Sequence, residues 1–151
     1  MKSNQWYIFF FAITLSFFFS CESMKPAQNN NVSISKINME KSTLGSNSTV
    51  EITESGILIS ATERNGDTDV RRDKVSPKQW NELNRLVNNL DIRQMDTWEG
   101  PTQARFYDGA MATTITIETD GESYNSQSFD EGEPPAELKE LYDYLESLVN
   151  Q

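Results

Sequence analysis

The stretch from Phe106 to Val149 constrains the fold of this chain most strongly. Side chains in residues 110–118 alternate between two faces, and one face carries Met111, Thr113, Ile115 and Ile117. A period of two with β-branched residues is typical of a strand that buries one face. The following pair, Asp120-Gly121, favours the positive φ angles of a type I′ turn. Residues 122–129 are therefore predicted to complete an antiparallel hairpin.

A helix is predicted directly after this hairpin. Pro134 and Pro135 suit the first turn of a helix, where a missing N–H group leaves no hydrogen bond unmade. Apolar residues then recur at helical spacing, namely Ala136, Leu138, Leu141, Tyr142, Leu145, Leu148 and Val149. This apolar stripe needs a partner, and the half-buried hairpin offers a matching face.

Four short strands and a second helix are predicted upstream. The strands are expected at residues 32–39, 49–53, 56–63 and 70–75. Ile34 and Ile37 depart from a period of two, which predicts a β-bulge or a change of face in the first strand. Ser76, Pro77 and Gln79 form the pattern of a capping box, which marks the start of a helix. Its predicted apolar stripe is Trp80, Leu83, Leu86, Val87 and Leu90.

These elements predict an α+β fold with a single globular domain at residues 32–151. We expect a two-layer sandwich, in which two amphipathic helices cover one face of a mostly antiparallel sheet. Residues 91–107, between the first helix and the hairpin, are expected to form a long irregular connection. Loops of this length are uncommon unless they are functional or partly structured.

Composition excludes several kinds of chemistry. The chain contains no histidine, which removes Ser-His-Asp catalysis and histidine-containing zinc sites. Cys21 is the only cysteine, so no intramolecular disulfide can form. The net charge of −10 argues against nucleic acid as a partner. No cofactor is predicted.

The N-terminus has the pattern of a processing signal. Lys2 is followed by an apolar run from Ile8 to Phe19, about a dozen residues, which is too short for an ordinary transmembrane helix. Ser20-Cys21 ends the run and resembles the lipobox of bacterial lipoproteins. That resemblance implies a signal peptide at residues 1–20 and a lipidated Cys21 as the first residue of the mature protein, with a membrane anchor in the cell envelope, on its periplasmic face or at the cell surface. The alternative is an ordinary secretory signal that happens to end at a cysteine.

Residues 21–31 are polar and predicted to form a flexible tether between the lipid and the domain. Beyond the tether, the layout is similar to small uncharacterised domains of Bacteroidetes-like lipoproteins. The matching features are Gly45, the helix from Ser76-Pro77 to Leu90, and the stretch from Phe106 to Leu148. Since that family has no assigned activity, the resemblance implies no catalytic residues.

Aromatic and arginine side chains provide the candidate binding residues, because these types supply most binding hot spots. They are Arg93, Trp98, Arg105, Phe106, Tyr107 and Tyr124. One interpretation is a groove for a ligand or a protein; the other is that the aromatic residues close one end of the core. The first predicts an envelope protein that binds a protein partner, or alternatively a small molecule or glycan through the 93–107 loop.

The acidic residues suggest two kinds of chemistry, metal binding and glycoside hydrolysis. The run Asp130 to Glu133, with Asp108 nearby, has oxygen ligands of the kind calcium prefers, but it also suits a polar loop before a helix. Paired carboxylates can hydrolyse glycosides, yet no spacing among the many Asp and Glu residues selects a pair. The sequence therefore predicts neither a metal site nor an enzymatic activity.

Overall fold

The computed structural model describes residues 32–150 of the chain. The predicted signal peptide, Cys21 and the tether lie outside this part. The described strands are β1 (Ile34–Thr43), β2 (Ser46–Thr53), β3 (Gly56–Thr62), β4 (Thr68–Asp73), β5 (Ala112–Thr119), β6 (Ser123–Asn125) and β7 (Phe129–Asp130). The α-helices are α1 (Pro77–Asn88) and α2 (Lys139–Val149), and the short 3-10 helices are η1 (Ile92–Thr97), η2 (Ala104–Phe106) and η3 (Ala136–Leu138).

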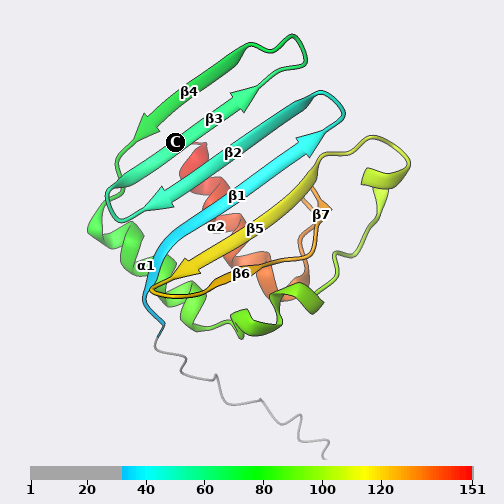
Figure 1. The fold of residues 1–151 in the computed structure, drawn as a ribbon. Coiled ribbons are helices and arrows are strands. Elements are labelled where there is room, and N and C mark those ends of the chain that lie inside the picture. Colours follow the sequence, from blue (N-terminus) through cyan, green and yellow to red (C-terminus); the bar gives the residue numbers. More distant parts are fainter. Residues whose placement is uncertain (1–31, 151) are drawn as a thin grey trace, which may run out of the picture.

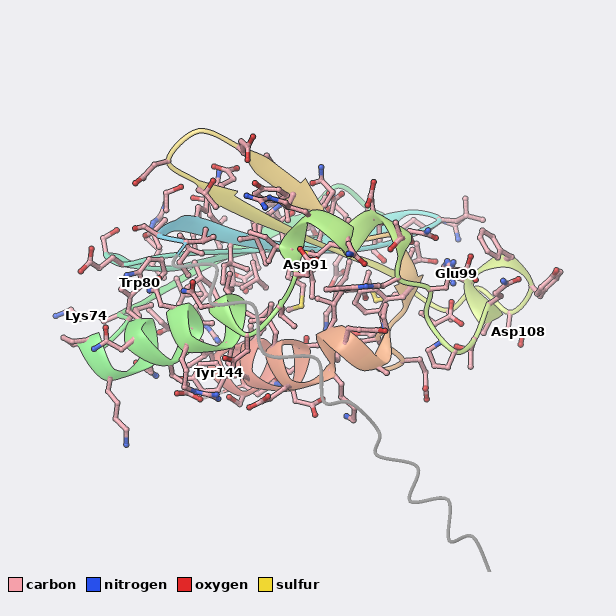
Figure 2. The ribbon with its side chains drawn as sticks, turned by 90° about the horizontal axis from the view of Figure 1, so that it is seen from below. Lys74, Trp80, Asp91, Glu99, Asp108 and Tyr144 are labelled. Carbon is pink, nitrogen blue, oxygen red and sulfur yellow. The ribbon has the colours of Figure 1, made fainter. Side chains whose placement is uncertain are left out.

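The predicted α+β sandwich is confirmed. The strand order is β4-β3-β2-β1-β5-β6, every pairing is antiparallel, and β7 pairs with β5 beyond the end of β6. Both α-helices lie behind the sheet in Figure 1 and below it in Figure 2, so they cover the same face. No helix in the described range is long and apolar enough to cross a bilayer.

Strand register assembles the core. Ile37 of β1 lies between Ile52 of β2 and Ile117 of β5, and all three side chains are fully buried. Two residues further along β1, Met39 lies between Val50 of β2 and Ile115 of β5, and these three side chains are also buried. The helices close this face with Leu83, Leu86, Leu141 and Leu145. Since side chains alternate along a strand, the opposite face of the sheet carries mostly polar residues and no helix.

Two local predictions are confirmed. The register of β1 against β5 shifts between Ile34 and Lys36, which is the predicted irregularity. At the start of α1 the Ser76 hydroxyl accepts a hydrogen bond from the Gln79 N–H, and the Gln79 side chain accepts one from the Ser76 N–H. These bonds satisfy N–H groups that have no partner within the helix.

The prediction of one continuous second strand in the hairpin is wrong. Residues 122–129 form two short strands instead of one, because β5 advances three residues from Thr116 to Thr113 while its partner advances four, from Asn125 to Phe129. The extra residue is a bulge, which interrupts the ladder. Ser126 fills the interruption: its hydroxyl accepts a hydrogen bond from the Ile115 N–H at 2.9 Å.

The predicted type I′ turn is also wrong. Positive φ angles occur in the described residues only at Gly45, Gly66, Gly109 and Gly132, so neither Asp120 nor Gly121 has the geometry of that turn. The connection is closed by a hydrogen bond from the Thr119 N–H to the Glu122 carbonyl. Since β6 has only three residues, this turn need not match the twist of a long strand pair.

Substitution of Phe129 tests the contribution of β7 to core packing. Its ring is fully buried and meets the Tyr142 ring edge-on, with 5.6 Å between centroids. We expect Phe129→Ala to lower the free energy of unfolding by about 3–5 kcal/mol, measured by urea denaturation. The matched control is Phe106→Ala, an exposed ring that should cost less than about 0.5 kcal/mol. Equal costs for the two variants would contradict this core assignment.

Candidate interaction site at the far end of the sheet

The β1–β2 turn and the loop before β5 meet at one end of the sheet. Ser42, near the end of β1, pairs with Ala112 at the start of β5. The Thr43 hydroxyl also donates a hydrogen bond to the Gly109 carbonyl, 3.4 Å away. Figure 1 shows the turn and the loop that carries η2 projecting side by side at this end, which we call the far end because β1 begins at the other.

Most of the large exposed apolar side chains in the described residues gather at the far end. They are Leu44, Phe106 and Tyr107, with 96%, 64% and 82% of their surface exposed. The remaining one, Val70 of β4, lies on the opposite edge of the sheet and is 45% exposed. Scattered apolar residues on a surface need no explanation, but a group at one place marks a candidate interaction site. We call Leu44, Phe106 and Tyr107 the far-end patch.

A hollow of about 330 Å³ lies within the far-end patch. Its lining residues come from the end of β1 and the β1–β2 turn, the η2 loop, the start of β5 and the segment before β7: Ser42, Thr43, Leu44, Arg105, Phe106, Gly109, Ala110, Ala112 and Ser128. A second hollow of about 350 Å³, which includes Glu40 and Asn47, shares Ser42 and Thr43 with the first. The two hollows therefore flank the β1–β2 turn and offer a continuous uneven surface.

Asp130 holds the η2 loop in place. Its carboxylate is 2% exposed and accepts hydrogen bonds from the Thr102 hydroxyl at 2.5 Å and from the N–H groups of Ala104 at 2.5 Å and Arg105 at 3.0 Å. The Arg105 guanidinium adds a fourth bond at 3.0 Å, which is also an ion pair. Both carboxylate oxygens are thus occupied by donor groups, which holds residues 102–105 of the loop against β7.

The same hydrogen bonds control the charge of Asp130. Burial by itself would raise the pKa of this carboxyl group, but the bonds from Thr102, Arg105 and Ala104 outweigh burial and hold the pKa well below its ordinary value of 3.8. Asp130 is therefore ionised at neutral pH. Because its oxygens face donors, it is placed as a loop anchor and not as a cation ligand.

Arg105 connects this anchor to the patch. Its guanidinium carbon lies 4.3 Å from the centroid of the Phe106 ring, a cation–π distance. One face of the ring is thereby held by a side chain that Asp130 fixes, while most of the ring stays exposed. Phe106 is consequently preorganised, which lowers the entropic cost of a contact through this ring.

Lys41 joins the far end to helix α2. Its ammonium group lies 2.8 Å from the Glu131 carboxylate and 2.7 Å from that of Glu146. Burial by itself lowers the Lys41 pKa, but the hydrogen bonds to the two carboxylates outweigh it and raise the pKa. Lys41 is thus charged, and its charge is balanced inside the protein.

The six candidate binding residues do not form one site. Arg105 and Phe106 line the far-end hollow with Tyr107 next to them, whereas Arg93 and Tyr124 line a hollow of about 180 Å³ beside β6. Trp98 lines a further hollow between the end of α1 and the start of α2, and it packs against the core. These hollows share no residue. Trp98 thus helps to close the core, while Phe106 and Tyr107 point away from it.

Sequence reasoning missed two residues of the site. Leu44 sits in a turn before Gly45, and a large apolar side chain at such a position was the available signal. Asp130 belongs to an acidic run that suggests a calcium ligand, and its role as a loop anchor is not visible in the sequence because its hydrogen-bond donors are 25–28 residues away in the chain. Among residues 32–150, no group of three cysteine, aspartate or glutamate side chains is placed to hold a metal ion.

Comparison of the chain with protein-family models, with curated proteins and with solved structures found no match. The resemblance to lipoproteins therefore stays a prediction from the sequence.

Replacing Asp130 should change the dependence of stability on pH. A carboxyl group whose folded-state pKa is lowered stabilises the fold above its unfolded pKa and loses this contribution as the pH falls toward the folded value. The wild-type chain should thus lose stability progressively below about pH 4. We expect Asp130→Asn to have a lower melting temperature at pH 7 and a flatter profile below about pH 4, followed by circular dichroism. A profile parallel to that of the wild type would contradict this role.

Proposed function

We propose that this chain is a lipid-anchored protein of the cell envelope whose domain binds a protein partner through the far-end patch. The observation that carries the proposal is the gathering of Leu44, Phe106 and Tyr107 on a turn and a loop that Asp130 fixes. Exposed aromatic and apolar side chains on a preorganised surface are typical of interaction sites.

The position of the chain entry supports this proposal. Val32 is hydrogen-bonded to the Asn88 side chain at the end of α1, with its N–H donating at 2.7 Å and its carbonyl accepting at 3.0 Å. The ten residues of β1 separate this point from Leu44, a span of about 33 Å. A tether at residues 21–31 would enter at the end of the sheet remote from the patch, so an anchor at Cys21 would leave the patch accessible.

A ligand-binding function is the second candidate. The far-end hollow has a volume near the lower limit for small-molecule sites. Its cationic group, however, is already engaged, because the Arg105 guanidinium bonds to Asp130. The groups best placed for contact are instead the outward-facing apolar side chains, which favours a protein partner. We propose no catalytic role for Asp130, because its carboxylate serves as the loop anchor.

Cys21→Ala tests the anchor. We expect this variant to lose acylation and to leave the membrane fraction, because two or three acyl chains are what would hold the domain stably on a bilayer. Fractionation of envelopes and mass spectrometry of the N-terminal peptide measure both effects. A variant that is processed normally and remains in the membrane would refute lipidation at Cys21.

The patch is tested by changing its side chains together. A Leu44→Ser, Phe106→Ser, Tyr107→Ser variant should retain roughly a tenth or less of the partner that the wild-type full-length protein retains from detergent-solubilised envelopes. Quantitative mass spectrometry measures the yield. Val70→Ser is the matched control, because it removes an exposed apolar side chain from the opposite edge of the sheet. Equal retention by the patch variant and the control would refute the proposal, and stabilisation of the wild type by a small ligand would favour the second candidate.

A further inference from the structure

Charge is divided very unevenly between the two halves of the domain. Residues 32–90 contain eight basic and eight acidic side chains and are neutral overall. Residues 91–150 contain three basic and fourteen acidic side chains, a net charge of −11. The second half provides β5, β6, the η2 loop and helix α2, so its carboxylates lie along β5 and behind the sheet, and the η2 loop that carries Phe106 and Tyr107 belongs to this acidic half.

The basic side chains beside the far-end patch are mostly neutralised from within. Lys41 is paired with Glu131 and Glu146, and Arg105 is paired with Asp130. Arg64 is the remaining basic residue here, and its aliphatic stem packs against Gly45. These pairs leave Arg64, which forms no ion pair within residues 32–150, as the unbalanced positive charge here, against the carboxylates that face solvent.

Two carboxylates at the far end have no partner within residues 32–150. Glu40 lines the second hollow beside the β1–β2 turn, and Asp108 precedes Gly109, which lines the first. Neither side chain makes a hydrogen bond or an ion pair with the described residues. Figure 2 shows Asp108 and Glu99 at the same end of the molecule, remote from Lys74. The patch is therefore an apolar surface with an unbalanced negative border.

We propose that the far-end patch binds a cationic, apolar segment of its protein partner, with a large apolar side chain in the hollow between Leu44 and Phe106 and lysine or arginine side chains over Glu40 and Asp108. This inference rests on the proposed function and adds the chemistry of the partner. Charge complementarity favours this partner. The carboxylates would repel an acidic segment, and they would form no ion pairs with a neutral one.

The two hollows suit an extended segment. They meet at Ser42 and Thr43, and the β1–β2 turn with Leu44 stands between them. Side chains of an extended peptide alternate in direction, so neighbouring side chains can reach either side of that turn. The apolar contact supplies affinity, while the charges supply orientation and a faster approach.

Labelled peptides test this inference on the full-length protein in non-ionic detergent. The probe is a six-residue peptide with a Leu-Trp pair between lysines, and the comparison peptides carry glutamines in place of the lysines, or glycines in place of Leu-Trp. Fluorescence anisotropy is measured at about 50 mM and about 300 mM salt, with protein-free micelles as the blank. The lysine and Leu-Trp peptide should bind most tightly, and its binding should weaken at the higher salt concentration.

Two double variants with the same change in net charge distinguish the effect of carboxylates beside the patch from the effect of the protein's net charge on peptide binding. Glu40→Gln with Asp108→Asn should weaken binding of the lysine peptide roughly threefold to tenfold. Glu54→Gln with Asp120→Asn removes two carboxylates from turns at the other end of the sheet and should change binding less than about twofold. Equal effects of the two pairs, equal binding of the lysine and glutamine peptides, or no binding of any peptide would overturn the inference.

The envelope purification distinguishes a failure of this inference from a failure of the proposed function. If retention of the envelope partner depends on Phe106 and Tyr107 while peptide binding ignores charge, the interaction function stands and the cationic partner is refuted. If the patch variant retains its partner as well as the Val70 control does, the interaction function at this patch fails and the inference fails with it.

Discussion

The pairing of β1 with β5 is the constraint on which the rest of the structure depends. It joins residues that are 70 to 85 positions apart in the chain and places Ile37 and Met39 in the centre of the sheet. Because β1 also pairs with β2, one strand sets the register on both sides. A shift by one residue would turn these apolar side chains to the solvent face, so burial fixes the register.

The same pairing creates the candidate site. It brings the end of β1 next to the start of β5, so the loop before β5 must leave the sheet beside the β1–β2 turn. Asp130, on the short strand that also pairs with β5, then captures the backbone of this loop. A buried carboxylate is stable here because four donors replace the water it has lost. An electrostatic contact in the core thus positions apolar groups on the surface.

Surface chemistry follows from how charge is divided along the chain. The strands from β1 to β4 and helix α1 are balanced, whereas the later part of the domain carries the whole net negative charge. Lys41 and Arg105 are held in internal ion pairs, so their positive charges do not offset the negative charge around Phe106. An apolar group within such a field favours partners that combine both properties, which is how charge adds specificity to an apolar contact.

The sequence by itself determined the fold class, both α-helices, the capping box at Ser76 and the irregularity in β1. All of these depend on local periodicity and capping patterns. It also identified Phe106, Tyr107 and Arg105 as candidate binding residues. Only the tertiary structure decided that Trp98 serves the core, that Leu44 joins the patch and that Asp130 anchors the loop. The physical reason is that each of these roles depends on contacts between residues distant in the chain. The bulge at Ser126 belongs to the same class, since an extra residue is recognised only against the strand it faces.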